Sequence, residues 1–148
     1  MAEVFQNSIL WTTFLAAFIA QALKSIQEII FQRKLNLHRV FETGGMPSSH
    51  SAAVASLATS MGLVHGWNSP EFTISIVLAV IVIYDATGIR RAAGEHAEIL
   101  NDLLEEFNYL LHEGFERQHL KTLLGHTYPQ AVAGILIGII ISMIFYYN

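Results

Sequence analysis

Two histidines, His50 and His126, each stand just ahead of a long apolar stretch of the sequence. Before His50 come two glycines, a proline and two serines, an order typical of a tight turn that leads into a helix N-terminus. Such a terminus offers free backbone N–H groups and a partial positive charge, which suit a phosphate. Ser48 and Ser49 would add hydroxyl donors, and His50 a group that titrates near neutral pH. The simpler alternative is that the serines only cap the helix.

Charged residues in or next to two other apolar stretches could complete an anion site. Asp85, Arg90 and Arg91 follow one such stretch, and the planar fork of arginine suits bidentate contact with phosphate oxygens. Lys24 lies inside another, where a charged side chain is costly and indicates function by default. The alternatives are that Asp85 pairs with an arginine, and that Lys24 pairs with Glu28 or extends to the interface.

The surroundings of His126 also predict a helix start. Pro129 fits the first turn of a helix, so we expect His126 at the same membrane level as His50. A second histidine group, His112, Glu116 and His119, has a spacing that could bind a metal. That run is acidic and hydrophilic, so we interpret it as a solvated face and expect no metal site.

The composition indicates a membrane protein of one domain, residues 1–148. The 148 residues are 53% hydrophobic and 14% charged, with a mean hydropathy of +0.44, whereas soluble domains are about a quarter charged. The net charge of −4, with only 8 Lys and Arg, argues against a nucleic-acid partner. The absence of cysteine excludes disulfides, thiolate metal sites and cysteine nucleophiles.

Four segments are long and apolar enough to span the roughly 30 Å of a bilayer core as helices. They cover about residues 8–31, 51–67, 72–89 and 130–147, and the second is marginal in length. None of the apolar runs has an interior proline, which favours helices over barrel strands. Residues 92–114 follow the spacing of an amphipathic helix with an acidic opposite face. We expect this fifth helix to pack on the bundle with its acids in the cytosol.

The basic residues predict the orientation. Seven of the eight lie in the loops 32–50 and 90–128, and the eighth is Lys24. The positive-inside rule then makes those loops cytoplasmic. We expect a multi-pass protein of the cell membrane, with both termini outside and the histidine motifs facing the cytoplasm.

Three motifs in combination resemble one protein family. GGMPSSHSA at 44–52, YDATGIRRAAG at 84–94 and LGHT at 124–127 are similar to the divergent branch of the type 2 phosphatidic acid phosphatase superfamily. That branch is also described as acid phosphatase/vanadium-dependent haloperoxidase-related. The resemblance covers nearly the whole chain. It implies an all-α, polytopic membrane bundle with a reduced phosphatidic acid phosphatase/haloperoxidase-like core.

The resemblance also implies roles for single residues. His126 would be the nucleophile and His50 the acid, with Asp85 or Gln130 orienting one of the histidines. The phosphate would be held by basic and hydroxyl side chains, namely Lys24, Ser48, Ser49, Arg90 and Arg91. The chain departs from the superfamily pattern at three positions: Gln130 stands in place of Asp, Leu120 in place of an upstream arginine, and Ser49 in place of glycine.

We therefore expect an integral-membrane lipid phosphatase that needs no metal or cofactor. It would hydrolyse a phosphate monoester or pyrophosphate on a phospholipid or isoprenoid through a phosphohistidine. Small residues at 131, 133, 134 and 138 would permit the close helix contact of a homodimer. One alternative is a non-catalytic or weakly active membrane protein that binds phospholipid or isoprenyl phosphate. Another is a small transporter or proton relay built on Lys24, Glu28 and Asp85.

Overall fold

The computed structural model describes residues 2–32, 45–111, 120–122 and 124–147. Every regular element in this part of the chain is helical, which confirms the all-α fold class. In chain order the helices are α1 (Ala2–Phe5), α2 (Ser8–Gln32), α3 (Ser49–His65), α4 (Pro70–Tyr84), the π-helical turn η2 (Asp85–Ile89), α5 (Arg90–Leu111) and α6 (Tyr128–Tyr147).

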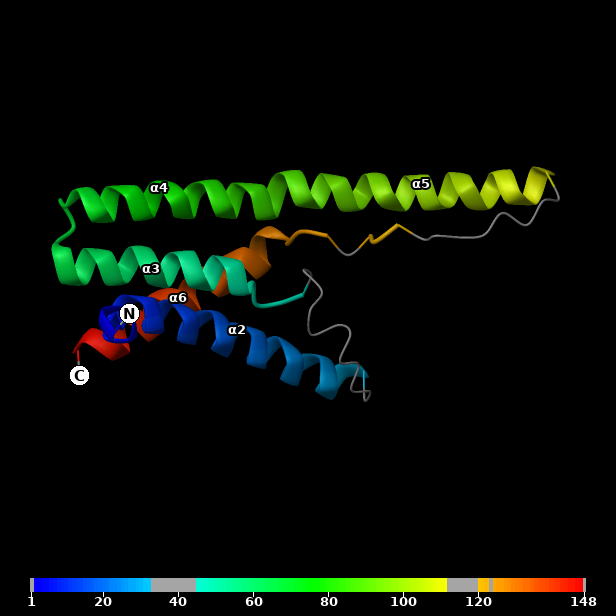
Figure 1. The fold of residues 1–148 in the computed structure, drawn as a ribbon. Helices are drawn as coiled ribbons and strands as arrows, with labels where there is room; N and C mark the ends of the chain where they lie inside the picture. The colour runs from blue at the N-terminus through cyan, green and yellow to red at the C-terminus, as the bar shows by residue number, and fades with distance from the viewer. Residues whose placement is uncertain (1, 33–44, 112–119, 123, 148) are drawn as a thin grey trace.

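Four of these helices form a bundle in which successive members run in opposite directions (Figure 1). α3 is the central member, because it packs against α2, α4 and α6. The N- and C-termini lie together at one end of the bundle, next to the turn between α3 and α4 (Figure 1). The other end gathers the N-termini of α3 and α6 with the C-terminus of α4.

α3 can occupy the centre because it is built from small residues. Its buried positions include Ala52, Ser56 and Ser60, and the facing positions of α6 are Gly134 and Gly138. A Cβ atom on Gly134 would overlap the Ser48 carbonyl, and one on Gly138 would overlap the Ala52 carbonyl. The two backbones therefore pack at very short range, as small residues allow in membrane helices.

This packing changes the role expected for the small residues of the last helix. Ala131, Gly134 and Gly138 are buried, and the two glycines lie against α3 of the same chain. These positions are therefore not free to build a homodimer, and the homodimer itself stays a prediction. Farther along the same contact, Ser142 bonds to Ser56 (Oγ–Oγ 2.8 Å) and Ser60 (3.1 Å), all three fully buried.

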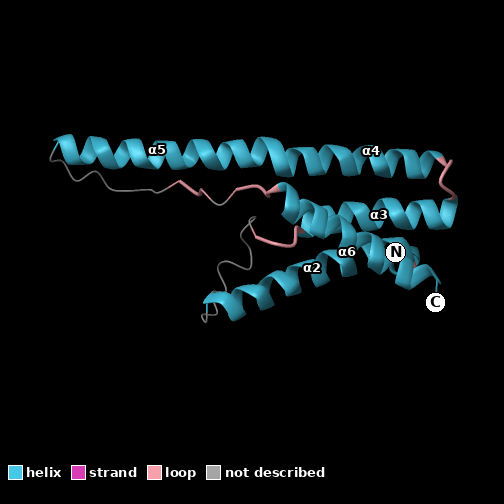
Figure 2. Ribbon diagram, turned by 180° about the vertical axis from the view of Figure 1, so that it is seen from behind, coloured by secondary structure: helices cyan, strands magenta, loops and turns pink. Residues whose placement is uncertain are grey.

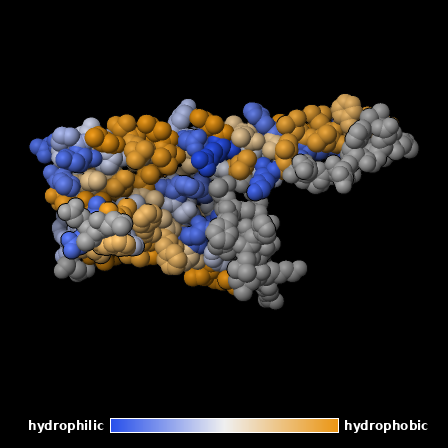
Figure 3. All heavy atoms as spheres, viewed as in Figure 1, coloured by the Kyte–Doolittle hydropathy of each residue, from blue (hydrophilic) through white to orange (hydrophobic). Residues whose placement is uncertain are grey.

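The outer surface of the bundle is apolar. Three stretches in the described part of the chain are long and apolar enough to cross a membrane: Ser8–Gln27, Pro70–Phe107 and Tyr128–Tyr147. Large side chains such as Phe18, Ile74 and Ile81 are exposed on them, as is usual where lipid is the solvent. The expected count of four spans is not confirmed. The second expected span corresponds to α3, which has only 17 residues and is not among the three stretches. Figure 3 shows this apolar surface, crossed by hydrophilic atoms where α4 meets α5.

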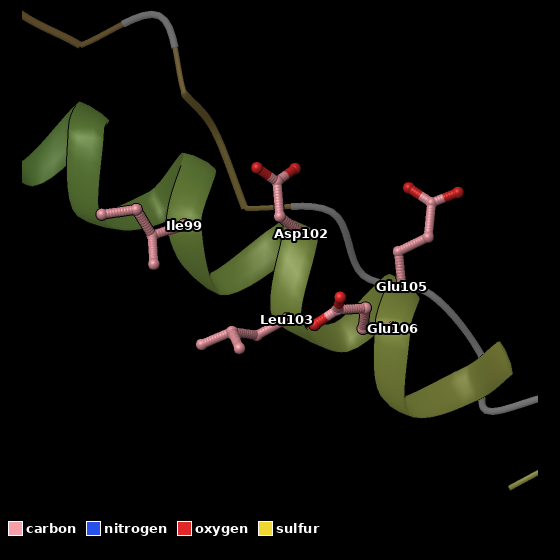
Figure 4. A pocket seen from close by; sticks show the side chains of 5 residues that line it. All are labelled: Ile99, Asp102, Leu103, Glu105 and Glu106. Carbon is pink, nitrogen blue, oxygen red and sulfur yellow. The ribbon is translucent and has the colours of Figure 1, made fainter. Parts of the chain in front are cut away.

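The expected packing of the amphipathic helix is wrong. α4, η2 and α5 form one continuous rod, so α5 projects beyond the bundle instead of folding back on it (Figures 1 and 2). No proline or turn sequence separates the two helices, and the π turn joins them without a break. Apolar side chains of α5 such as Leu100 and Phe107 therefore stay exposed. Figure 4 shows a shallow pocket on α5, with Ile99 and Leu103 directed away from Asp102 and Glu105.

Candidate active site

A small pocket lies at the end of the bundle away from the termini, where α3, the junction of α4 with α5 and the segment before α6 meet. It is lined by His50, Val82, Asp85, Ala86, Arg90 and His126. The ring centroids of His50 and His126 are 6.3 Å apart, with the rings tilted by 54°. Two histidines that are distant in the sequence thus face one pocket.

The first turn of α3 is built as its sequence predicts, with Ser48 as the N-cap. The Ser48 hydroxyl accepts a hydrogen bond from the Ser51 N–H, and Ser48 is fully buried. The Ser48 N–H donates to the Gln130 carbonyl at 3.1 Å, which ties the start of α3 to α6. Capping therefore accounts for Ser48, while Ser49 is half-buried and His50 is exposed at the pocket.

Lys24 lies beneath the turn that precedes α3. Its side chain is 4% exposed, so it does not extend to the interface. A Cβ atom on Gly45 would lie 2.7 Å from Cε of Lys24, and Gly45 has a φ of +97°, where glycine is favoured. The charge of Lys24 lowers the pKa of both His50 and His126, as expected for a cation close to the two rings. The side chain of Glu28, the partner that Lys24 would have in the alternative interpretation, lies outside the described residues.

The π turn positions His126. In η2 the Arg90 N–H reaches back five residues to the Asp85 carbonyl, and the return to α-helical spacing leaves the next carbonyl, that of Ala86, free to accept another donor. That donor is the His126 N–H, at 2.9 Å. The His126 side chain is 5% exposed, and its Nδ1 has no hydrogen-bond partner among the described residues. A buried ring nitrogen without a partner is what a ligand would satisfy.

The two arginines have different surroundings. Nε of Arg90 lies 2.7 Å from an Asp85 carboxylate oxygen, and both residues line the pocket. Nε of Arg91 lies 3.1 Å from Glu95, one turn along α5, and Arg91 is not part of the lining. Of the two, the structure therefore brings Arg90 to the histidines.

Gln130 has a structural task at the start of α6. Its side-chain oxygen accepts a hydrogen bond from the Thr127 N–H at 3.0 Å. Thr127 is the N-cap of α6 and Gln130 is the third helical residue. A bond from the N-cap N–H to the side chain of the third residue is one of the two hydrogen bonds of a capping box. Gln130 also lies close enough to the His126 ring to favour its protonated form. Gln130 is neutral, whereas the superfamily pattern described above has a carboxylate at this position.

Both pocket histidines lie outside the three apolar stretches, and the pKa of each is lowered from the ordinary histidine value. Burial is the main cause that lowers the pKa of His126. The hydrogen bond with Gln130 is the next largest effect and raises it, while the smaller effects of His50 and Lys24 lower it further. For His50, burial again comes first, followed by Arg90 and Lys24, while Asp85 acts in the opposite direction. Both rings thus favour the neutral state at pH 7.

The described residues contain no group of three or more His, Asp or Glu side chains that could hold a metal ion. The predicted His112, Glu116 and His119 group lies outside the described residues.

Comparison with known proteins identifies the family. Residues 5–141 match the family described as the divergent PAP2 family. The chain belongs to this family. It is also 40% identical, over 154 aligned residues, to a Bacillus subtilis (strain 168) protein named "Uncharacterized membrane protein YuiD". That alignment covers 98% of each chain. No solved structure matches. The name of this relative and the three apolar stretches agree that this divergent PAP2 protein is a membrane protein.

Sequence motifs anticipated most of the side chains at the pocket but not the contacts that position them. His50, Asp85, Arg90 and His126 come together, Lys24 lies close by, and Ser48 and Arg91 are engaged elsewhere. The Ala86 carbonyl was missed, because a backbone group has no signal in the sequence. The spacing of Gly134, Gly138 and Ser142, four residues apart, could have indicated the close contact with α3.

Proposed function

We propose that this divergent PAP2 protein is an integral-membrane lipid phosphatase that works through a phosphohistidine and without a metal. The observation that carries the proposal is the approach of His50 and His126 within 6.3 Å across a pocket that also holds Arg90. The 6.3 Å separates the ring centroids, and both rings line the same pocket, so a nitrogen of each ring can contact one phosphate group. Holding two reacting groups against one phosphate in this way is what lowers the entropic cost of the reaction.

His126 acts first as the nucleophile. Its neutral ring nitrogen forms a bond to phosphorus, and the bond from phosphorus to the lipid oxygen breaks on the opposite side. His50, in its protonated form, gives its proton to the departing oxygen as general acid. With a phosphate monoester, the products of this step are a lipid alcohol and a phosphoryl group on His126. With a pyrophosphate, the bond to the bridging oxygen breaks, and the lipid product is a monophosphate.

The second step reverses the role of His50. Its neutral ring now takes a proton from water, whose oxygen forms a bond to phosphorus while the bond to His126 breaks. Inorganic phosphate leaves, and His50 carries the proton needed for the next cycle. Asp85, which favours the protonated form of His50, supports this alternation.

Positive groups balance the charge of the phosphoryl oxygens. Lys24 and Arg90 lie close enough to act on the histidines, and the N-terminus of α3 contributes backbone N–H groups and its partial positive charge. The free N–H groups at this terminus and the hydroxyl of Ser49 are further donors for the phosphate. Arg91, paired with Glu95, contributes more weakly.

The apolar surface next to the pocket suits a lipid or isoprenoid tail. Val82 lines the pocket, and Leu78, one turn earlier on α4, is exposed. A tail along this face of α4 would stay in hydrocarbon while its phosphate meets the histidines. The substrate is a phospholipid or an isoprenyl (pyro)phosphate, and the surrounding membrane lipids form its solvent. By the positive-inside rule the pocket faces the cytoplasm of the cell membrane, and both termini lie outside.

A phosphate-release screen tests the proposal. Purified protein in detergent is given phosphatidic acid, phosphatidylglycerol phosphate or an isoprenyl pyrophosphate, with and without EDTA. We expect release that persists in EDTA, is inhibited by orthovanadate as a transition-state mimic, and disappears in His126→Ala. Labelled phosphate should be trapped on the wild type and not on His126→Ala. Activity abolished by EDTA would contradict the metal-free mechanism.

The state of Gln130 favours one second candidate, a non-catalytic or weakly active protein that binds the same lipid phosphates. Gln130 is a neutral amide whose oxygen already accepts from the Thr127 N–H, so position 130 supplies no negative charge to an imidazolium at His126. Tight binding of a lipid phosphate with no release from any member of the panel would select this candidate.

A further inference from the structure

The segment that brings His126 to the pocket is attached to α5 far from the pocket. On α5, Nδ2 of Asn101 donates to the Leu120 carbonyl, and Oδ1 of Asn101 accepts from the Leu120 N–H, both at 3.0 Å. One side-chain amide thus satisfies both backbone groups of a single residue. The described residues 120–122 form no helix or strand, so backbone groups there need partners from elsewhere in the chain.

Two glycines allow the same segment to follow α5 closely toward the pocket. A Cβ atom on Gly94 would lie 2.6 Å from the Thr122 carbonyl oxygen, so only glycine fits there without movement. Gly125 lies on the backbone of Arg91, where a Cβ atom would come within 2.5 Å of the Arg91 nitrogen, and its φ is +82°. The next contact is the bond from the His126 N–H to the Ala86 carbonyl.

These contacts occur in antiparallel order. As the residue number in the segment rises from 120 to 126, the residue number of its partner falls. The partners are, in turn, Asn101, Gly94, Arg91 and Ala86. Figure 2 shows residues 120–122 and 124–127, drawn in pink, lying beside α5 on the way to the start of α6. The register of the segment is therefore set along α5, and a shift by one residue would move the His126 ring by about 3 Å.

We infer that Asn101 is a positioning residue for His126. It holds Leu120 in register on α5 and thereby keeps the His126 ring in the pocket with His50. Asn101 touches neither the pocket nor the reacting atoms, and it lies fifteen residues from Ala86, which is about 22 Å along a helical rod. The inference rests on the proposed function for its effect on chemistry, whereas its effect on the position of the segment can be measured without a substrate.

The test compares Asn101→Ala with Glu106→Ala, an exposed position on the opposite side of the same helix. Hydrogen exchange at the His126 amide is measured first, because this N–H is bonded to Ala86. We expect faster exchange limited to residues 120–127 in Asn101→Ala, and none in Glu106→Ala. A general loss of structure would instead accelerate exchange in α3 and α6, and would overturn a role specific to His126.

Phosphate release is then measured on the same variants. Asn101→Ala should lower kcat by about 10- to 100-fold, as expected for misplacement of a reacting group by about an ångström. KM should stay near its wild-type value, because Lys24, Arg90 and α3 are unchanged. Asn101→Asp, which keeps the acceptor for the Leu120 N–H and loses the donor, should be intermediate. Equal kcat in all variants despite faster exchange would overturn the inference.

The two proposals fail in different ways. If the wild type releases no phosphate from any lipid, the proposed function is wrong, and the exchange data alone decide whether Asn101 positions His126. If the wild type is active and the His126 amide of Asn101→Ala exchanges as slowly as that of Glu106→Ala, the proposed function stands and the role of Asn101 is wrong.

Discussion

The roles proposed for His126 and His50 require opposite protonation states of two neighbouring rings. His126 must be neutral to attack, and burial, which lowers its pKa, favours that state. His50 must carry a proton to release a poor leaving group, and the nearby Asp85 favours that state against burial and the charge of Arg90. At the scale of single residues, the site therefore depends on how these opposing influences balance.

Replacement of His50 by alanine tests the acid role. Loss of a general acid typically costs about 10²–10⁴ in rate, and we expect that loss in His50→Ala with lipid alcohols as leaving groups. p-Nitrophenolate leaves without a proton, so the loss with p-nitrophenyl phosphate should be much smaller. Steady-state kinetics on both substrates measure the difference, and equal losses would contradict the assignment.

The pH dependence of kcat/KM follows from the two lowered pKa values. The acid limb reports His126, which must lose its proton, and the alkaline limb reports His50, which must keep one. Because both values lie below the ordinary histidine pKa of about 6.5, both limbs move to lower pH, and the optimum should lie on the acid side of about pH 6.5. The alkaline limb should be absent from the profile of His50→Ala. An optimum above about pH 8 would show that the assignments are wrong.

Replacement of Gln130 by glutamate should restore a charge partner for His126. A glutamate oxygen can still accept from the Thr127 N–H, so the capping box is retained, and a negative charge is favourable at a helix N-terminus. The carboxylate would raise the pKa of His126 and move the acid limb of kcat/KM to higher pH. The pH profile of Gln130→Glu measures this, with Gln130→Ala as the variant that has neither the negative charge nor the hydrogen bond to Thr127. An unchanged acid limb would mean that His126 does not produce it.

At the scale of elements, the site depends on how closely α6 approaches α3. Gly134 lies against Ser48, the N-cap of α3, and Ser51 in its first turn, on either side of His50 in the chain. The same approach allows the Ser48 N–H to reach the Gln130 carbonyl. The relative position of the two helix N-termini, and so of the two histidines, is therefore coupled to the absence of a side chain at position 134.

Gly134→Ala should separate these helices. A methyl group there would overlap the Ser48 carbonyl and lie 3.0 Å from Cβ of Ser51, and overpacking of this kind costs about 1–3 kcal/mol. We expect lower thermal stability in detergent and loss of phosphate release. The matched control is Gly88→Ala, a helical glycine whose Cβ would meet no atom within 4 Å. It should be neutral or slightly stabilising, and an equal effect of both substitutions would contradict the packing argument.

At the scale of the whole molecule, both described ends of the chain lie at one end of the bundle and the pocket lies at the other (Figure 1). The end with the chain termini exposes aromatic side chains that suit a membrane interface, including Trp11, Trp67 and Tyr147. Arg90 and Arg91 are exposed at the end with the pocket. This asymmetry agrees with a pocket on the cytoplasmic side, as proposed.

Cysteine labelling tests that orientation, and the chain contains no native cysteine to interfere. Asn68→Cys places an exposed thiol in the turn between α3 and α4, and Glu105→Cys places one on the projecting α5. In intact cells a membrane-impermeant maleimide should label only the first, and in inverted vesicles only the second. The reverse pattern would place the pocket outside the cell.

The sequence by itself determined the fold class and predicted most of the side chains that line the pocket. Long apolar runs without prolines can satisfy their backbone groups in lipid only as helices, and the turn and capping residues around His50 and His126 specify helix starts through local bonds. The tertiary structure alone decided that the two rings share a pocket, that Arg90 and not Arg91 lines it, and that α5 extends beyond the bundle. Those outcomes depend on contacts between distant segments, such as the hydrogen bond from the His126 N–H to the Ala86 carbonyl and the two hydrogen bonds between Asn101 and Leu120. Local sequence cannot encode such contacts, because the partners meet only when the helices pack.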